Sequence, residues 1–303
     1  MTVTTLQAAG ASCQIHSFGA TVTSFKSADG RENLFVSSLA KTDGSKAIRG
    51  GIPLVFPIFG PSTSPSTMPQ HGFARVNTWE LVSTTQEDTA ATATYRLELQ
   101  NVVAGRGEHN MWSIEQAKKD GTDCQLTYVV RLEAQKLTTT LTAVNTGQTT
   151  FPVETLLHTY YAIQTPHDAD KTFVEGLGDY SIVDKVSKKS GHLQPANEKV
   201  VLDGETDRDF HPAANQTVAK VVLTDSGTAI QIEASGYKQE KTEVPVSCVV
   251  WNPGKDKAAS MGDMDDDAYE HMICVEPGIL ADNAVTLEPG QQVSLSQVIT
   301  VEQ

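Results

Sequence analysis

The sequence is poor in positive charge. Its 303 residues include 23 lysines and arginines against 37 aspartates and glutamates, and the formal net charge is −14. This balance argues against non-specific binding to nucleic acid or to an anionic membrane, because both surfaces repel an acidic protein. It does not exclude a phosphorylated small molecule, since affinity for one phosphate group depends on the local field of a few donors.

Several other signals are missing. No apolar run is long enough to span a bilayer, and the first residues lack the charged, apolar and small segments of an export signal. The cysteines lack the spacing of metal ligands, so we expect reduced thiols in a cytoplasmic protein. The chain also has no phosphate-cradling glycine loop before a helix and no Gly-x-Ser-x-Gly nucleophile motif. The scattered cysteines are Cys13, Cys124, Cys248 and Cys274.

What the chain does have is alternation of apolar and polar residues. Gln125–Leu132 alternates in this way, and Leu137–Val144 continues the pattern after a short polar connection, which predicts a β-hairpin. Many such segments predict an all-β sandwich, and without a linker or repeat we expect a single domain over residues 1–303. The further candidate strands are Ile15–Phe25, Ala91–Leu99, the hairpin Val218–Leu223 with Ala229–Ala234, and the C-terminal pair Val285–Leu287 and Val293–Val301. Met111–Lys118 is the one candidate for a short helix.

Two segments in the first quarter set arginines beside residues that restrict the backbone. They are Arg49-Gly-Gly-Ile-Pro-Leu-Val-Phe-Pro-Ile-Phe-Gly60 and Pro69-Gln-His-Gly-Phe-Ala-Arg75. Glycines reach backbone angles closed to other residues, and prolines limit their neighbours. A guanidinium held by such a backbone presents a planar fork of donors to a carboxylate or phosphate. The alternative is a buried proline-rich turn with two ordinary surface arginines.

Two later segments carry further polar side chains among apolar ones. Leu156–Tyr161 places His158 among apolar and aromatic residues, and His271–Gly278 ends an apolar run on Glu276 followed by Pro-Gly. Each residue has a structural alternative, because His158 could be a hydrogen-bonded core histidine and Glu276 a turn residue that accepts backbone amide bonds.

Five strings in this order resemble the glucose-6-phosphate 1-epimerase family of the aldose-1-epimerase-like superfamily. They are RGGIPLVFP, PQHGFAR, LLHTYY, VVWNP and ICVEPG, and the resemblance runs from about Ile15 to the C-terminus. The resemblance implies a large antiparallel β-sandwich, often called a supersandwich, with its site on a concave sheet face. It also implies an isomerase that interconverts the anomers of hexose 6-phosphates, mainly glucose 6-phosphate, as a small-molecule substrate.

Interconverting anomers requires opening the sugar ring. A base takes the proton of the C1 hydroxyl while an acid protonates the ring oxygen, so a carboxylate and an imidazole suffice. We therefore expect no cofactor and no metal. The resemblance makes Glu276 the general base, His158 the general acid and His71 a second imidazole that binds or polarises the sugar. It points to Arg49 and Arg75 for the phosphate group.

Three further positions are candidates for contact with the sugar, and the resemblance itself points to one of them, Asp207. Gln70, beside His71, can donate to and accept from a sugar hydroxyl. Asp207 matches a position thought to contact the sugar, although a solvated acidic loop explains it nearly as well. Trp251 either stacks on the apolar face of the sugar or fills the core, and we favour the core.

Two metal-site interpretations have less support. An acidic cluster over residues 263–267 lacks the sixth-position glycine and the spaced glutamate of a calcium loop, so we expect a solvated loop. A site of His71, His158 and Glu276 is neither supported nor excluded by their separation in the sequence. Two other functions stay open: a mutarotase of unphosphorylated aldoses and a non-catalytic carbohydrate-binding module. No apolar surface stripe demands a partner chain, so we expect a monomer.

Overall fold

The protein is seen here in a computed structural model, which describes residues 1–61, 68–102, 119–165, 168–213 and 216–302. Antiparallel sheets dominate it, as the alternation predicts. The largest sheet consists of β5 (Glu80–Gln86), β6 (Ala91–Glu98), β7 (Cys124–Glu133), β8 (Lys136–Asn145), β12 (Thr172–Glu175), β16 (Val218–Asp225), β17 (Thr228–Lys238), β18 (Thr242–Val244) and β22 (Gln292–Glu302). Its order is β12-β16-β17-β22-β8-β7-β6-β5, and β18 pairs with β17. The C-terminal strand β22 therefore joins the two halves of this sheet.

A second, eight-stranded sheet carries the candidate site. It consists of β4 (Leu54–Val55), β10 (Thr155–Leu157), β11 (Tyr160–Ala162), β13 (Ser181–Asp184), β14 (Lys189–Leu193), β15 (Thr206–His211), β19 (Ser247–Asn252) and β20 (Met272–Ile279). Its order is β14-β13-β15-β19-β20-β10-β4, and β11 pairs with β20. All residues of β19 and β20 are buried, because both faces of these central strands are covered.

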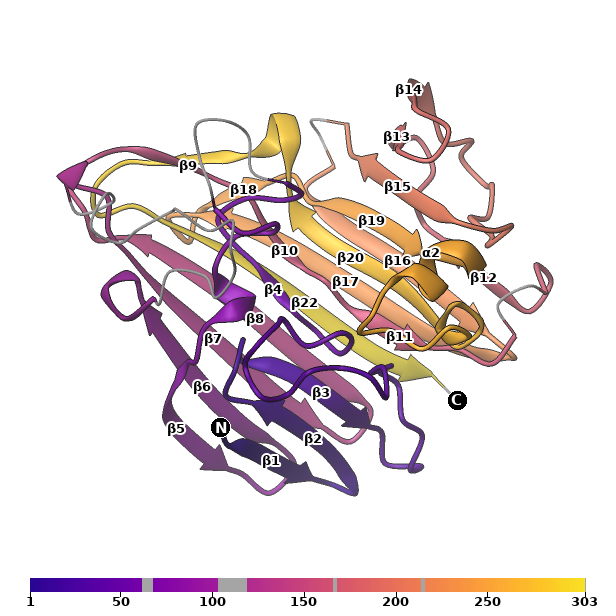
Figure 1. Cartoon of the computed structure of the whole chain (residues 1–303), viewed down its shortest axis with the longest axis horizontal. Coiled ribbons are helices and arrows are strands. Elements are labelled where there is room, and N and C mark those ends of the chain that lie inside the picture. Colours follow the sequence, from indigo (N-terminus) through magenta and orange to yellow (C-terminus); the bar gives the residue numbers. More distant parts are fainter. Residues whose placement is uncertain (62–67, 103–118, 166–167, 214–215, 303) are drawn as a thin grey trace.

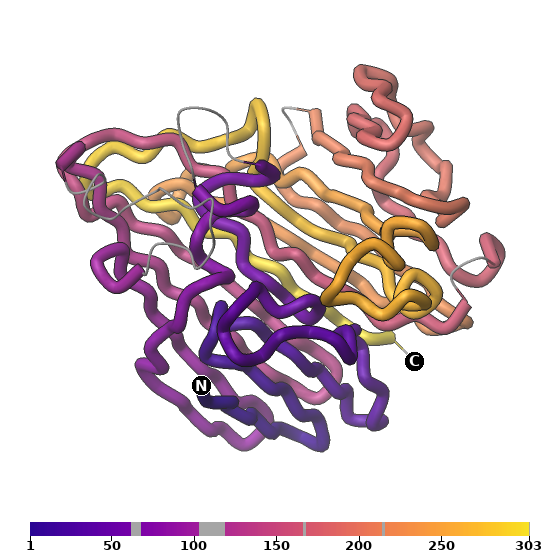
Figure 2. Tube along the Cα trace, viewed as in Figure 1, coloured from indigo at the N-terminus to yellow at the C-terminus, as the bar shows by residue number. Residues whose placement is uncertain are grey.

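Smaller sheets complete the sandwich. Three strands, β1 (Val3–Ala8), β2 (Ala11–His16) and β3 (Thr21–Lys26), form one sheet, and β9 (Phe151–Val153) pairs with β21 (Val285–Leu287). The three-stranded sheet packs on β6 and β7, whereas β10 and β20 of the eight-stranded sheet pack on β22 (Figure 1; Figure 2). Two different sheets thus pack on the nine-stranded sheet.

Strand periodicity explains the core between these layers. In β7 the residues alternate strictly between buried and half-buried, with Leu126, Tyr128, Val130 and Leu132 on the buried face. The predicted hairpins β7–β8 and β16–β17 are confirmed in register, and the all-β expectation is confirmed with them.

Two strand predictions need correction. Residues 15–25 are not one alternating strand, because β2 ends at His16 and β3 begins at Thr21, with Gly19 at φ +73° in the turn between them. The C-terminal strands β21 and β22 are both present, but they do not pair with each other. β21 pairs with β9, while β22 pairs with β17 and β8.

Helices are short and few in the described ranges. They are the α-helix α2 (Gly254–Ser260) and the 3-10 turns η1 (Ala74–Val76), η2 (Leu99–Asn101), η3 (Ala268–Glu270) and η4 (Ala281–Asn283). The predicted helix at Met111–Lys118 lies outside the described residues, and α2 carries no periodicity that would have predicted it. No helix in the described ranges has the length and apolarity that crossing a membrane requires. All four cysteines lie in those ranges, where each is buried and free.

Candidate active site

A cavity of about 540 Å³ lies over the outer face of the eight-stranded sheet. Strand register places its floor: Asp209, Val249 and Glu276 are opposite one another on β15, β19 and β20. Asp207 and Trp251 lie two residues away on the same face, as the period of two requires. All seven site residues expected from the sequence line this one cavity, namely Arg49, Gln70, His71, Arg75, His158, Asp207 and Glu276.

His158 owes its position to an interruption between β10 and β11. Both strands pair with β20, yet the amide of Thr159 turns back to the carbonyl of Leu157 at 2.9 Å, and the amide of His158 reaches Pro53. A local irregularity of this kind re-aims a side chain out of the ladder. The imidazole of His158 consequently approaches Glu276 of β20, and it stacks on Tyr160 of β11 with ring centroids 4.9 Å apart.

The side-chain amide of Gln297 stabilises the interruption between β10 and β11. Gln297, on β22 of the nine-stranded sheet, is fully buried. Its Oε1 accepts a hydrogen bond from the hydroxyl of Thr159 at 3.0 Å, and its Nε2 donates to the hydroxyl of Tyr161 at 2.8 Å. These two bonds connect the sheets directly beneath His158.

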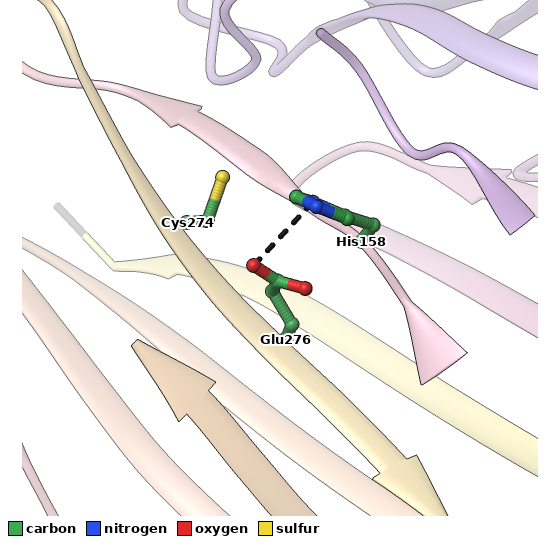
Figure 3. A group of neighbouring side chains, drawn as sticks. All are labelled: His158, Cys274 and Glu276. Atoms are coloured by element: carbon green, nitrogen blue, oxygen red, sulfur yellow. Dashed lines mark ion pairs between the residues drawn. The ribbon is translucent and has the colours of Figure 1, made fainter. Parts of the chain in front are cut away.

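His158 and Glu276 form a close pair. Nδ1 of His158 lies 3.4 Å from Oε1 of Glu276, and both side chains are almost entirely buried (Figure 3). Among the described residues, Nδ1 of His158 and Oε2 of Glu276 have no hydrogen-bond partner. Buried polar atoms normally have partners, so these two are oriented for a ligand in the cavity.

Burial opposes charge on both members of this pair. It raises the pKa of Glu276 well above its usual value, and Asp207 and Asp209 add to this effect. Burial lowers the pKa of His158 well below its usual value, and the positive charges of Arg75 and Arg49 lower it further. Burial therefore favours the uncharged forms of the pair, a carboxylic acid beside a neutral imidazole.

His71 is held in one orientation by its backbone. It has φ +65°, and Gly72 follows at φ +73°, where a Cβ would lie 1.9 Å from the carbonyl oxygen of Phe56. The amide of Gly60 donates to Nδ1 of His71 at 3.2 Å, so the neutral ring carries its proton on Nε2. Burial and the nearby cations Arg75 and Lys185 lower the pKa of His71 to about 2. It is therefore a fixed neutral donor.

Arg49 is held in place by two residues, Tyr160 and Asp263, that do not line the 540 Å³ cavity, called here the sugar-sized cavity. Its guanidinium donates to the hydroxyl of Tyr160 at 3.2 Å and lies 3.3 Å from the carboxylate of Asp263. Asp263 is buried and also pairs with Lys46 at 3.0 Å. Burial alone would raise the pKa of Asp263, but Arg49 and Lys46 outweigh it and lower that pKa. The expectation of a solvated loop at 263–267 is thus wrong for Asp263.

Arg75 is the less compensated of the two arginines. It donates to the carbonyl of Gln70 at 3.1 Å, and no ion pair to it is formed by a described residue. Burial and the neighbouring Arg49 lower the pKa of Arg75 to about 10, so it still carries its charge near neutral pH. A second cavity of about 330 Å³ shares Arg49, Gln70 and Arg75 with the first and adds Lys46. Cationic groups thus gather where the two cavities meet.

The opposite side of the cavity is acidic. Asp207 and Asp209 lie on β15, and Nζ of Lys185 is 3.5 Å from the first and 2.8 Å from the second. Lys185 also lies 4.4 Å from the ring centroid of Phe59. Asp207 is therefore an ion-paired residue of the floor and not part of a solvated loop. Lys185 and Asp209 were missed, because neither lies in a recognisable motif, whereas Asp263 was noticed only as a member of the acidic cluster.

Trp251 packs in the core, as we favoured, and its ring also reaches the cavity. Its indole is 8% exposed and packs edge-on against His158 and Tyr160, at centroid distances of 6.1 and 5.9 Å. It also lines the cavity. An aromatic ring on the floor offers an apolar surface to the C–H face of a sugar.

One group in the described part of the chain has the composition of a metal site: His158, Cys274 and Glu276. His71 does not belong to it, and its ring centroid lies 5.7 Å from that of His158. The two-histidine, one-carboxylate arrangement considered from the sequence is therefore not the grouping that the fold brings together.

Comparison with known families gives a match over nearly the whole chain. The model of the aldose 1-epimerase family matches residues 2–300. A protein of Cenchrus ciliaris named "Putative glucose-6-phosphate 1-epimerase" is 28% identical over 293 residues, covering 92% of this chain and 78% of that protein. A protein of Escherichia coli (strain K12) with the same name is 30% identical over 264 residues, covering 85% and 76%.

Solved structures give the same result for the fold. The crystal structure of a protein described as a putative mutarotase (YeaD) from Salmonella typhimurium superposes with a TM-score of 0.77 at 25% identity, covering 99% of this chain and 90% of that one. The Slr1438 protein from Synechocystis sp. PCC 6803 superposes with a TM-score of 0.73 at 19% identity, covering 99% and 96%.

Proposed function

Since the chain belongs to the aldose 1-epimerase family, we propose that it interconverts the α and β anomers of hexose 6-phosphates, with glucose 6-phosphate as the main substrate. The observation that carries the proposal is the composition of one cavity. The close pair His158–Glu276 and the guanidiniums of Arg49 and Arg75 all line it. A mutarotase of unphosphorylated sugars needs the pair but not the two guanidiniums, one of which has no anionic partner among the described residues.

The reaction divides into two proton transfers. The carboxylate of Glu276 takes the proton of the C1 hydroxyl while protonated His158 gives a proton to the ring oxygen, and the C1–O5 bond breaks. Rotation about C1–C2 turns the other face of the aldehyde to O5. The same two groups then return their protons in reverse, and the ring closes as the other anomer. No atom is lost and no electron is transferred.

The uncharged form of the pair, which burial favours, is the form reached midway through the reaction, when the ring is open. After ring opening, Glu276 holds a proton and His158 is neutral, which is the uncharged form that burial favours. Before ring opening, the proton must lie on His158 instead. A bound phosphate brings about 1.5 to 2 negative charges beside the arginines, offsets the field that lowers the pKa of His158, and so favours the reactive form. Phosphate thus contributes to turnover as well as to binding.

The remaining lining residues orient the sugar. His71 presents a fixed N–H, and Gln70 presents an amide whose Nε2 lies 3.4 Å from Nε2 of His71. Asp207 offers carboxylate oxygens to hydroxyl groups, while Trp251 offers its face. These residues, with the pair and the two arginines, match the three chemical parts of a sugar phosphate: anomeric centre, hydroxyl groups and phosphate.

The decisive experiment is magnetisation-exchange NMR on the anomeric protons in phosphate-free buffer. Glucose 6-phosphate and glucose are compared, each with wild-type protein and with the isosteric variant Glu276→Gln. We expect faster exchange for glucose 6-phosphate, and a loss of about 10² to 10⁴ in rate for the variant.

The outcomes separate the candidate functions. Equal acceleration of glucose and glucose 6-phosphate would replace the proposal with a general aldose mutarotase. Saturable binding of glucose 6-phosphate to folded protein without faster exchange would make it a carbohydrate-binding module. Full activity of Glu276→Gln would reject the assignment of Glu276 while leaving the substrate assignment in place.

A further inference from the structure

Cys274 lies beside the acid–base pair and has no part in the reaction proposed above. It precedes Glu276 by two residues on β20, so both side chains leave the same face of the strand. Cys274 is opposite Tyr160 on β11 and opposite Trp251 on β19, so it lies in the row next to Glu276. Figure 3 shows its sulfur on the same side of β20 as the carboxylate of Glu276.

The three potential ligand atoms are close enough to share one ion. Each of His158, Cys274 and Glu276 offers one atom, and these atoms lie within 4.8 Å of one another. A tetrahedral zinc site with bonds of about 2.0 to 2.3 Å has ligand atoms about 3.3 to 3.7 Å apart. The distance of 3.4 Å between Nδ1 of His158 and Oε1 of Glu276 already has this value. The sulfur lies within 4.8 Å of both other ligand atoms, so a small approach would complete the set.

A second observation points to a ligand at the same place. Nδ1 of His158 is buried without a hydrogen-bond partner among the described residues, and the same is true of Oε2 of Glu276. An ion between the three side chains would satisfy both residues. The fourth position of the tetrahedron faces the cavity, because His158 and Glu276 line it.

The donor set selects the kind of ion. One imidazole, one thiolate and one carboxylate suit zinc(II), and the sulfur disfavours magnesium and calcium, which prefer all-oxygen sites. The thiolate and the carboxylate together neutralise a divalent charge. We propose that His158, Cys274 and Glu276 form an inhibitory site for zinc(II) and similar thiophilic divalent cations such as cadmium(II). The proton of the thiol and that of the carboxyl group pass to solvent when the ion binds.

Zinc should inhibit the enzyme because two of its ligands, His158 and Glu276, are the proposed acid–base pair. A nitrogen and a carboxylate bound to the ion cannot exchange protons with the sugar, so zinc and substrate exclude each other. The binding step is independent of the proposed function, whereas the inhibition rests on it. Free zinc in excess would then limit anomer exchange without touching the phosphate-binding arginines.

Cadmium titration of the full-length protein tests the binding step directly. A thiolate–cadmium bond gives an ultraviolet charge-transfer band, which reports the sulfur ligand whatever the activity. We expect one equivalent to produce the band in wild type, and zinc to displace it. Cys274→Ala should lose the band and bind zinc more weakly by at least the roughly 10- to 100-fold that the loss of a residue supporting a ligand costs. The matched control is Cys248→Ala, because Cys248 is an equally buried cysteine on β19 in the core between the sheets.

Activity measurements test the inhibition. Zinc should raise the KM for glucose 6-phosphate in wild type and in Cys248→Ala, and Cys274→Ala should resist it. No band in wild type, or a band that survives Cys274→Ala, would overturn the proposed site. A band that depends on Cys274 in a protein without epimerase activity would reject the proposed function and leave the metal site standing. A band together with undiminished turnover at saturating zinc would overturn the inhibitory role.

Discussion

The carboxyl group of Glu276 and the imidazole of His158 share a buried space in which each is driven toward its uncharged form. Their facing atoms are 3.4 Å apart. Moving a proton from the carboxyl group to the imidazole turns the neutral pair into an ion pair without changing the net charge of the cavity. Such a pair titrates as a unit, so its two groups respond jointly to a charged substrate.

Protein stability should depend on pH through Glu276. Its folded-state pKa is raised, so its contribution to stability is complete below the ordinary value of 4.5 and is lost as the pH rises toward the folded-state pKa. Glu276→Gln cannot ionise. We expect its free energy of unfolding to gain on wild type by up to about 1.4 kcal/mol per pH unit above 4.5.

Urea unfolding at several pH values from about 5 to about 8 measures this difference. The control is Glu233→Gln, because Glu233 is an exposed carboxylate on β17 whose partner Lys220 is exposed too. A Glu276→Gln advantage that stays constant over this range would mean that Glu276 is ionised in the folded protein.

Arg75 should distinguish phosphorylated from plain sugar. A charge-assisted hydrogen bond contributes about 1.5 to 3 kcal/mol. We therefore expect Arg75→Gln to lower kcat/KM for glucose 6-phosphate about 10- to 150-fold and not to lower that for glucose. Arg131→Gln is the control, since Arg131 is paired with Glu87 on the surface. An equal loss for both sugars would assign Arg75 a structural role.

Asp263 should act through Arg49. Its carboxylate lies 3.3 Å from the guanidinium but does not line the sugar-sized cavity. Asp263→Asn keeps the shape and removes the charge, so Arg49 loses its anchor. We expect the KM for glucose 6-phosphate to rise about 5- to 20-fold with kcat changed much less. The control is Asp266→Asn, three residues along the same loop and exposed. An unchanged KM would contradict this positioning role.

Inorganic phosphate should activate the protein toward glucose. If the charge of the phosphate group promotes proton transfer to His158, a separate phosphate ion bound at the arginines replaces part of that effect. We expect millimolar phosphate to accelerate glucose anomer exchange about 3- to 30-fold in wild type and not in Arg75→Gln. The measurement is exchange NMR with chloride at equal ionic strength as control. Inhibition by phosphate would mean that the ion occupies the place of the sugar.

The sequence was sufficient to predict residues that line the cavity, but not the residues that hold them in place. His158 and Glu276 lie in strings that local composition makes recognisable, and the family match extends over residues 2–300. Asp263 was misjudged because its burial depends on Arg49, which is 214 residues earlier in the chain. Lys185 lies in a stretch without a motif, so only the neighbouring strand β15 reveals its partners.

Strands were predictable where their partners are local. The hairpins β7–β8 and β16–β17 follow from alternation and short turns. The pairing of β21 with β9 involves segments more than a hundred residues apart, and no local pattern encodes it. The interruption at His158 is equally invisible, because it depends on hydrogen bonds that His158 and Thr159 donate to the distant residues Pro53 and Gln297.

Gln297 also places a limit on the order of events during protein synthesis. The hydrogen bonds beneath His158 come from β22, the last strand of the described chain, which lies between β17 and β8. While β22 is still inside the ribosomal exit tunnel, the nine-stranded sheet has two unjoined halves and Thr159 lacks its buried partner. A nascent chain can therefore form its early hairpins, but it acquires the support beneath the His158–Glu276 pair only once β22 has left the tunnel. Assembly of the site therefore waits for β22.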